Sequence, residues 1–340
     1  MRVAEISTLH RPVPPEGEGS IENIVSILAE GLVRKGHEVT LFAAEDSRTS
    51  ARLRSPVRVT HSRNASMWDW QTYESFQVRE AFRVWKDFDV IHCHSYHFGL
   101  LFCDLVPIPS LHSIHIEPGP DYLFLAANTR NRRLHFCSRY QARDFADIAG
   151  VHVIPHGIDL ANFPAPAGTP GDYLAYLGRF LPDKGPLEAI RIAKQCGIPL
   201  KLAGPPNEYL RTVLEPEFRG APVEYIGEVQ GKAKADFLRD ALALLYPLQW
   251  GEPFGLVLIE AMACGVPVVA TNRGAVPEIV SHGKTGWLGE TEADLAEAVE
   301  IIADLDRAAI RRHVEEHFSS DRMVERIEKL LVEMSEGAKS

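Results

Sequence analysis

The sequence has few of the features that mark secreted or membrane-spanning proteins. Its 340 residues include 5 cysteines, and no two of them are spaced as a C-x-x-C pair. The number is odd, and the cysteines stand far apart among apolar neighbours, which predicts buried free thiols in a reducing compartment. No apolar run approaches the roughly 18 residues of a membrane span, and no signal peptide is recognisable. These absences predict a cytoplasmic protein without a transmembrane segment.

Positive charge is also scarce. The 36 Lys and Arg residues are outnumbered by 46 Asp and Glu residues, which gives a formal net charge of -10. The general attraction that proteins need for a phosphate backbone is therefore missing, and nucleic acid is not an expected partner. Hydrophobic residues make up 45% and charged residues 24% of the chain, as in ordinary globular proteins. At roughly 150 residues per domain, this length predicts about two domains.

Extended and helical segments alternate in the first half of the chain. Apolar residues recur at i, i+3 and i+4 over residues 21–32, where Ser20 offers an N-cap and Gly36 an end. The other expected elements are strands at residues 3–7, 37–43 and 89–92 and a helix at residues 75–85, with a polar stretch rich in Arg and Ser after residue 43. This order of strands and helices predicts a parallel sheet.

A second series of the same kind follows. Its expected strands lie at residues 172–177, 200–203, 223–226, 243–246 and 267–270, and its helices at residues 186–195, 232–240 and 255–263. The sequence thus favours two doubly wound α/β domains. Ligands of such sheets bind at the carboxyl ends of the strands, so a cleft between the domains is the predicted site.

Proline-rich residues near the middle of the chain separate the two series. We expect an N-terminal Rossmann-like domain at residues 1–154, a linker at 155–171 and a C-terminal Rossmann-like domain at 172–318. The last segment, residues 319–340, has one apolar stripe at helical spacing. We expect this helix to pack back on the N-terminal domain.

Two glutamates eight positions apart stand in the most distinctive run of the sequence, residues 250–270. Glu252 precedes an expected helix and Glu260 lies inside it. Gly255 marks the helix start, where unpaired backbone N–H groups and the positive end of the dipole favour an anion. At about 1.5 Å of rise per residue, the two carboxylates are roughly 12 Å apart. This spacing suits a ligand with hydroxyl-rich ends and a diphosphate between them.

Two cations follow the first strand of the second series. Gly178 ends that strand, and Arg179 and Lys184 lie in the loop after it. An arginine and a lysine together suit a diphosphate. Such a pair is often an ordinary surface feature, but its place after a strand and beside the glutamate run favours the binding function.

These residues carry a resemblance to the retaining glycosyltransferases of family 4, which have the GT-B fold. Glu252 and Glu260 are similar to the family's E-x7-E motif. Further matching segments are residues 14–22, 34–40, 89–92, 153–159, 202–205 and 273–278. The resemblance extends over nearly the whole chain and implies an α/β protein with two Rossmann-like domains that face each other across a deep cleft. It places the acceptor on the N-terminal domain and the nucleotide-sugar donor on the C-terminal domain.

The resemblance also implies roles for residues of the C-terminal domain. Arg179 and Lys184 would bind the donor diphosphate and stabilise the leaving group, and Glu260 would hold the ribose hydroxyls. The transferred sugar would be held by the side chain of Glu252 and by backbone N–H groups around Phe254, Gly255 and Leu256. Cleavage of the sugar–phosphate bond leaves a diphosphate anion, so cationic clamping of the departing oxygen is the main catalytic effect. This scheme requires no metal and no organic cofactor.

In the N-terminal domain, the resemblance implies that the loop at Gly19 closes on the diphosphate. His115 is similar to the family's active-site histidine, which lies beside donor sugar and acceptor, and His112 is a nearby competitor for that role. Two departures stand out: Gly19 is followed by Ser20 where the family often has a second glycine, and His156 stands where the family often has asparagine. Neither departure removes a charge that the chemistry needs.

A zinc site is an alternative interpretation of the histidines at residues 92–97. His92, Cys93, His94 and His97 have donor spacings that could hold zinc, but the segment ends an expected strand and lacks a distant Cys or His partner in obvious register. We therefore expect no metal site.

Acceptor recognition has a weaker signal. Residues 67–76 hold Trp68, Trp70, Tyr73 and Phe76, an aromatic stretch that could stack on a sugar or simply pack in the core. Trp70, with the basic residues Arg130 and Arg133, is the candidate acceptor surface. The acceptor could be a small molecule, a glycan or a lipid-linked compound.

The combined interpretation is a retaining glycosyltransferase that moves a hexose-type sugar from a nucleoside diphosphate to an acceptor hydroxyl. UDP is the favoured nucleotide and GDP the next. The alternative is a non-catalytic protein of the same fold that binds sugar nucleotides; Arg179, Lys184, Glu252 and Glu260, all present, argue against it.

Overall fold

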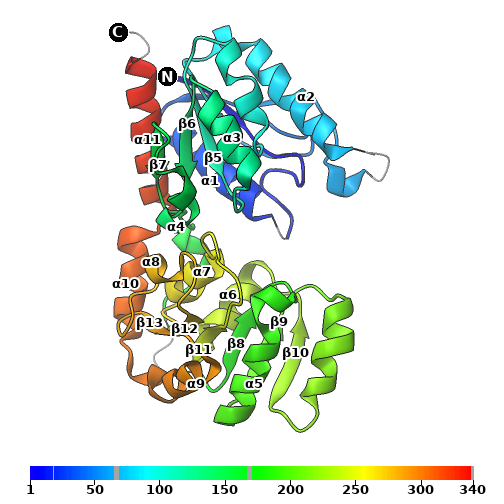
Figure 1. The fold of residues 1–340 in the computed structure, drawn as a ribbon, viewed down its shortest axis with the longest axis vertical. Coiled ribbons are helices and arrows are strands. Elements are labelled where there is room, and N and C mark those ends of the chain that lie inside the picture. Colours follow the sequence, from blue (N-terminus) through cyan, green and yellow to red (C-terminus); the bar gives the residue numbers. More distant parts are fainter. Residues whose placement is uncertain (18, 65–68, 167–170, 338–340) are drawn as a thin grey trace. The chain divides into compact units, whose positions relative to one another are not determined.

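The computed structural model describes residues 1–17, 19–64, 69–166 and 171–337. The chain forms two compact units: unit 1 comprises Met1–Gly157 and Ser320–Ser340, and unit 2 comprises Ile158–Ser319. The chain therefore leaves unit 1 once and returns to it for its last helix (Figure 1). Of the expected linker, residues 155–157 belong to unit 1 and residues 158–166 and 171 to unit 2. Residues 167–170 of the linker and Trp68 of the aromatic stretch lie outside the described residues.

Unit 1 contains a parallel sheet whose described strands run in the order β3-β2-β1-β4-β5-β6-β7. The strands are β1 (Arg2–Ile6), β2 (Glu38–Phe42), β3 (Arg52–Arg54), β4 (Val90–Cys93), β5 (Ser110–Ile114), β6 (Arg133–Phe136) and β7 (Val151–Val153). The helices are α1 (Ser20–Arg34), α2 (Trp70–Arg83), α3 (Pro120–Asn128), α4 (Arg139–Ala142) and α11 (Ser320–Gly337). The predicted parallel α/β arrangement is confirmed for this unit.

Local chemistry shifts several element boundaries away from the sequence expectation. Helix α1 begins at Ser20 itself, and Gly19 takes the N-cap position with φ of 152°. Helix α2 begins five residues earlier than expected, because the Asp69 side chain accepts a hydrogen bond from Gln71 N and caps it. The polar stretch after residue 43 contains β3, which pairs with β2 at the edge of the sheet. An exposed edge strand has little apolar pattern, so the polar composition of these residues did not predict β3.

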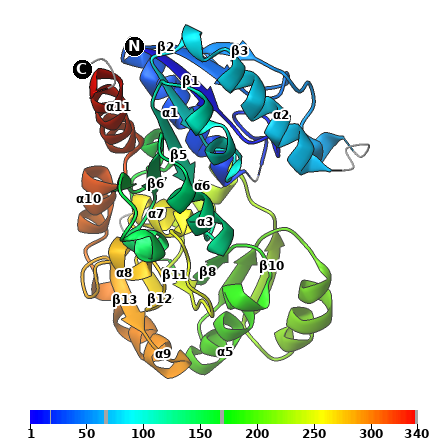
Figure 2. The same cartoon turned by 45° about the horizontal axis from the view of Figure 1, so that its top comes forward.

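Strand alternation sorts the sheet of unit 1 into two faces. Ala4, Ile6, Ile91 and Cys93 belong to a buried cluster that includes side chains of α2. Because successive side chains of a strand point to opposite faces, Glu5 and His92 must lie on the other face. Figure 2 shows α2 at full length beside this sheet.

Unit 2 contains a parallel sheet whose described strands run in the order β10-β9-β8-β11-β12-β13, and Figure 1 shows their labels in this order. The strands are β8 (Leu174–Leu177), β9 (Leu200–Ala203), β10 (Val223–Gly227), β11 (Ala243–Tyr246), β12 (Val268–Thr271) and β13 (Gly286–Gly289). The helices are α5 (Pro186–Cys196), α6 (Gly231–Arg239), α7 (Leu256–Ala263), α8 (Val276–Ile279), α9 (Glu292–Ile301) and α10 (Arg307–His317). The order changes direction at β8, and the carboxyl ends of β8 and β11 meet there. Such a switch point is the usual ligand site of a doubly wound sheet.

Helix α11 packs on α1 at very short range. Gly31 of α1 faces Val324 of α11, and a Cβ atom added at Gly31 would lie 2.5 Å from Val324 Cγ2. Glu328 of α11 forms an ion pair with Lys35 at 2.8 Å, and its Oε1 atom lies within hydrogen-bond distance of His37 Nε2, also at 2.8 Å. The absence of a side chain at Gly31 therefore allows the two helices to approach. Among the described residues, no helix combines the length and the apolar character that a membrane crossing requires.

A buried carboxylate joins α2 to two loops of unit 1. Glu74 has no exposed surface, and its Oε1 and Oε2 accept hydrogen bonds from Leu9 N at 2.6 Å and Ser95 Oγ at 2.5 Å. Burial raises the pKa of Glu74 from 4.5 to about 7, although these two donors act in the opposite direction. Folding therefore favours the protonated form of this side chain.

Replacement of Gly31 by Ala should be tolerated only when Val324 makes room. In the natural background, we expect overpacking to cost about 1–3 kcal/mol, offset by about 1 kcal/mol of helix propensity. In a Val324→Ala background the two closest contacts, with Cγ2 at 2.5 Å and Cγ1 at 2.8 Å, are gone and only Cβ at 3.2 Å remains, so Gly31→Ala should cost much less. Urea unfolding of the four proteins measures this coupling, and equal effects of Gly31→Ala in both backgrounds would contradict the packing described here.

Replacement of Glu74 by Gln should change how stability depends on pH. The raised native pKa means that the Glu74 contribution is complete below about pH 4.5 and is lost as the pH rises to about 7. At 1.36 kcal/mol per pKa unit, Glu74→Gln should gain about 3 kcal/mol relative to the natural protein over this range. Unfolding free energies at several pH values test this.

Glu80→Gln on the same helix is the matched control. Its half-buried carboxyl pairs with Arg83, which lowers the pKa of Glu80, so the stability difference between Glu80→Gln and the natural protein should not rise with pH. If the unfolding free energies of Glu74→Gln and the natural protein change in parallel with pH, burial does not raise the pKa of Glu74.

Candidate active site

The carboxyl ends of β8 and β11 in unit 2 carry the residues of the two main sequence motifs. Lys184 ends a short 3-10 turn, Pro182–Lys184, in the loop after β8. Glu252 lies in the loop after β11 and is 9% exposed. The Lys184 Nζ atom lies 2.6 Å from Glu252 Oε2, so the structure brings together two residues that are 68 positions apart in the sequence.

Two aromatic side chains complete this ion pair. The Tyr246 hydroxyl, from the end of β11, donates a hydrogen bond to Glu252 Oε2 at 3.0 Å. Burial raises the pKa of Tyr246 far above its ordinary value, and the charge of Glu252 adds to the effect, so the phenol remains a donor. Lys184 Nζ also lies 4.3 Å from the centre of the Trp250 ring, within the range of a cation–π interaction. Both charges of this ion pair are thus largely out of water.

Backbone geometry places Glu252 next to the start of α7. Gly255 is the N-cap of this helix, with φ of 87° in the left-handed region that favours glycine. Phe254 is buried against Phe318, which anchors the loop, and Leu256 is the first helical residue. The first turn of α7 therefore begins beside a cation, as an anion-binding helix terminus requires.

Helix α7 also carries Glu260, but its partner was not predicted. Glu260 Oε1 accepts a hydrogen bond from Lys234 Nζ of α6 at 2.6 Å. Because α7 begins at Leu256, only half of the eight-residue spacing from Glu252 is helical, and the straight-helix estimate of their separation does not apply to the rest. Lys234 stands three residues after Gly231, in a sequence with no distinguishing pattern, so only the fold reveals it.

Arg179 lies beside this group but points outward. It follows Gly178 at the end of β8 and is exposed, and it forms no ion pair with any other described residue. The backbone oxygen of Arg179 accepts a hydrogen bond from the Tyr176 hydroxyl at 3.2 Å, which holds the loop. Its guanidinium is therefore available for an anion.

Two candidate residues of unit 1, Gly19 and His115, lie at the carboxyl edge of its sheet. Gly19 precedes α1 in the loop after β1, and a Cβ atom added there would lie 2.5 Å from Pro15 Cβ. A side chain at this position is therefore excluded by contact as well as by the φ angle. Glu22 fixes the loop before α1, because its Oε1 atom accepts hydrogen bonds from Thr8 Oγ1 at 2.7 Å and Arg11 N at 3.0 Å.

His115, and not His112, has the exposure that a substrate-contacting residue needs. His112 is 1% exposed, bonds Ser110 through Nε2 at 2.9 Å, and packs against Gly99. His115 follows β5, is half-buried, and bonds His94 Nδ1 through its Nε2 at 2.9 Å. Burial, together with the neighbouring histidines His94 and His156, lowers the pKa of His115 well below its ordinary value. The ring is therefore neutral near pH 7.

A buried network behind His115 was missed from the sequence. The carboxylate of Glu5 lies 3.0 Å from His92 Nδ1 and 2.9 Å from His94 Nε2, with both histidines fully buried. Among the described residues, these three side chains also form a group close enough to hold a metal ion. Two features of the sequence could have revealed it: Glu5 is a charged residue in an otherwise apolar strand, and His92 and His94 are two positions apart, so that they lie on the same side of an extended chain. The sequence analysis considered only Cys and His as distant partners of His92 and His94, and therefore did not consider Glu5.

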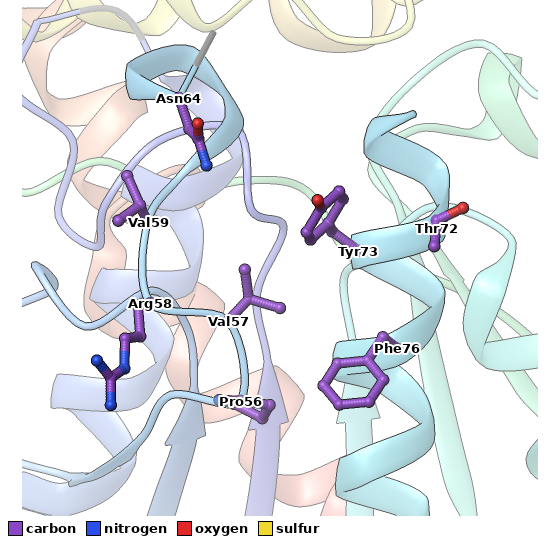
Figure 3. A pocket seen from close by; sticks show the side chains of 8 residues that line it. All are labelled: Pro56, Val57, Arg58, Val59, Asn64, Thr72, Tyr73 and Phe76. Carbon is purple, nitrogen blue, oxygen red and sulfur yellow. The ribbon is translucent and has the colours of Figure 1, made fainter. Parts of the chain in front are cut away.

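The aromatic stretch is divided between two environments. Trp70 is 37% exposed and lies 5.4 Å from the ring of Tyr96, in the loop after β4, so it reaches the carboxyl edge of the sheet. Tyr73 and Phe76 instead line an open, mostly apolar pocket of about 480 Å³ between α2 and residues 56–64 (Figure 3). Arg130 and Arg133 precede and begin β6, at the amino edge of the same sheet. The structure therefore does not bring Trp70 and these two arginines together.

Comparison with known proteins agrees with this geometry. The model of glycosyltransferase family 4 matches residues 21–162, and that of glycosyl transferases group 1 matches residues 163–317. A D-inositol 3-phosphate glycosyltransferase of Mycolicibacterium smegmatis is 27% identical over 98% of this chain and 91% of its own length. That of Pseudarthrobacter chlorophenolicus is 26% identical over 89% of this chain and 87% of its own.

Solved structures show the same fold. The crystal structure of AviGT4, a glycosyltransferase involved in avilamycin A biosynthesis, has a TM-score of 0.75 and 28% identity, covering 99% of this chain and 98% of AviGT4. Anabaena HepE in complex with UDP and glucose has a TM-score of 0.73 and 17% identity, covering 98% and 99%. With both halves matched by the family models, this chain belongs to the family 4 glycosyltransferases and has the GT-B fold.

Proposed function

We propose that this protein transfers a hexose-type sugar from a nucleoside diphosphate to an acceptor hydroxyl, with retention of anomeric configuration. The observation that carries the proposal is the partly buried Lys184–Glu252 pair, 2.6 Å apart, beside the N-terminus of α7. A cation and the N–H groups of a helix terminus bind phosphate, while a carboxylate accepts hydrogen bonds from sugar hydroxyls. One site therefore offers partners for both sides of the bond that breaks.

The catalytic contribution that we assign to these residues is electrostatic. As the sugar–phosphate bond breaks, negative charge grows on the diphosphate oxygen, and Lys184 and Arg179 stabilise it. Glu252 orients the sugar, and Glu260 takes the ribose hydroxyls after exchanging its bond to Lys234. Two positive side chains supply the charge that a metal ion would otherwise bring, so we propose metal-independent transfer.

UDP is the nucleotide that we propose for the donor. The support comes from structural neighbours: HepE of Anabaena has been solved with UDP, with UDP and glucose, and with UDP-glucose. These neighbours share 16–17% identity with this chain, and therefore guide only the choice of nucleotide to be tested first.

Thermal unfolding with UDP, GDP, ADP, dTDP and NAD in turn identifies the nucleotide. A ligand at a hundred times its Kd adds about 2.7 kcal/mol to the stability of the native state, so UDP should raise Tm and NAD should not. If GDP alone raises Tm, the donor is a GDP-sugar. If no nucleoside diphosphate raises Tm, the proposed donor site is wrong.

Replacement of Lys184 by Ala tests catalysis separately from binding. Loss of the charge that stabilises the leaving group should lower kcat at least about a hundredfold, as the loss of one oxyanion-stabilising group does. Lys194→Ala is the matched control, since it removes a lysine of the same unit whose ion pair with Glu217 is at the surface. Near-natural activity of Lys184→Ala would contradict the mechanism, and nucleotide binding without turnover in the natural protein would favour a non-catalytic binding protein.

A further inference from the structure

A line of polar side chains crosses unit 1 beneath His115, on the face opposite α2. Glu5 of β1 lies opposite His92 of β4 in register, and Ser113 of β5 lies opposite His135 of β6. The bonds run from Glu5 to His92 Nδ1 at 3.0 Å, from His92 Nε2 to Ser113 Oγ at 2.7 Å, and from there to His135 Nδ1 at 2.7 Å. His135 Nε2 ends the line on the carbonyl oxygen of Ile154 at 2.8 Å.

The protons of this line can be counted. Its two ends, a carboxylate and a carbonyl, are acceptors, and each of the four hydrogen bonds needs one proton. Two neutral histidines and one serine hydroxyl supply three protons. The line therefore holds one additional proton, which neutralises the charge of Glu5. Burial alone would raise the pKa of Glu5, but His92 and His94 outweigh it and lower that pKa to about 2. The network thus combines a buried Glu5 carboxylate with one additional proton that is shared along the line of hydrogen bonds.

A branch from Glu5 reaches His115. His94 Nε2 donates to Glu5 Oε2 at 2.9 Å, so the Nδ1 atom of a neutral His94 carries a lone pair. Burial lowers the pKa of His94 to about 4, which keeps this ring neutral near pH 7. His115 Nε2, 2.9 Å from His94 Nδ1, must then be the protonated nitrogen of the His115 ring. Its Nδ1 is left with a lone pair, and His156 packs nearly parallel to the ring at 5.3 Å.

The same donor atoms argue against a metal ion among Glu5, His92 and His94. Both nitrogens of His92 and both nitrogens of His94 are engaged in hydrogen bonds of 2.7–3.0 Å. A bound metal would have to take one nitrogen from each ring and would break the connection between Glu5 and both histidines. The hydrogen-bonded arrangement satisfies every one of these atoms without an ion.

We infer that Glu5 and His94 are positioning residues that fix the ring orientation and the tautomer of His115, so that its Nδ1 presents an unprotonated acceptor to a hydroxyl of the reacting sugars. This inference rests on the proposed function, because it supplies that reaction with its oriented histidine. Glu5 and His94 do not touch substrate. They act through His115, in the way that a carboxylate fixes the tautomer of a histidine at other active sites.

The proton count predicts which substitution is harmless. In Glu5→Gln, the amide oxygen accepts from His94 Nε2 and the amide N–H donates to His92 Nδ1, which supplies the fourth proton of the line. All bonds are then kept with neutral groups, and the His115 tautomer is unchanged. In His94→Phe, a ring of similar shape has no acceptor, and His115 Nε2 loses the bond that holds its proton.

The tautomer is measured directly by 15N NMR of histidine-labelled protein, with His115 assigned by comparison with His115→Gln. We expect the Nε2–H form of His115 in the natural protein and in Glu5→Gln, and a mixture of forms in His94→Phe. With the nucleotide that binds, kcat should fall about 10–100-fold in His94→Phe, as outer-sphere substitutions do, with donor KM and the Tm shift by nucleotide preserved. Glu5→Gln should stay within about threefold of natural kcat.

Three results would overturn the inference: an Nδ1–H tautomer of His115 in the natural protein, unchanged tautomer and kcat in His94→Phe, or one equivalent of metal in the purified protein by elemental analysis. If His94→Phe does not fold, the natural protein and Glu5→Gln still decide the tautomer. If the natural protein transfers no sugar, the proposed function fails on its own, and the tautomer still tests the inference.

Discussion

Taking a carboxylate out of water is the constraint on which both candidate half-sites depend. A buried charge is stable only when hydrogen bonds or an opposite charge replace the water that it has lost. Glu5, Glu22 and Glu74 in unit 1 and Glu252 in unit 2 are all at most 9% exposed. Their donors come from loops and strand ends at the carboxyl edges of the sheets, so satisfying these carboxylates also fixes the backbone around the candidate site.

The sequence was sufficient to locate candidate residues that stand out by type and spacing. Glu252, Gly255 and Lys184 belong to short motifs at strand ends, and the parallel order that places those ends together follows from the alternation of strands and helices. The strand at Ala243–Tyr246 was predicted to the residue, because an apolar run ends there at Pro247, which cannot continue the hydrogen bonding of a central strand. Helix starts were less predictable, since Gly19 rather than Ser20 caps α1, and which residue caps a helix depends on the path of the preceding loop.

Partners distant in sequence could not be predicted, because pairing across strands depends on register. Glu5 and His92 are 87 positions apart, and nothing in either segment announces the other until β1 and β4 are aligned. The same holds for Lys234 and Glu260 on neighbouring helices. The predicted acceptor surface grouped residues that the fold separates. Trp70 and Arg130 are plausible sugar contacts by residue type. Arg130, however, precedes β6 at the amino edge of the sheet, whereas Trp70 contacts Tyr96 in the loop after β4, at the carboxyl edge.

The carboxylates of Glu252 and Glu5 differ in how their charges are neutralised, and this difference matches the role proposed for each. Glu252 is balanced by Lys184, a flexible cation that can leave the carboxylate for a phosphate without breaking the fold. Glu5 is balanced by a proton shared along side chains of four adjacent strands, and these side chains cannot move without disrupting the sheet. A pair that must exchange partners during binding is best built from long side chains, whereas a group that must keep one histidine in one tautomer is best built from strands. Unit 2 therefore carries the adjustable half of the proposed chemistry and unit 1 the fixed half.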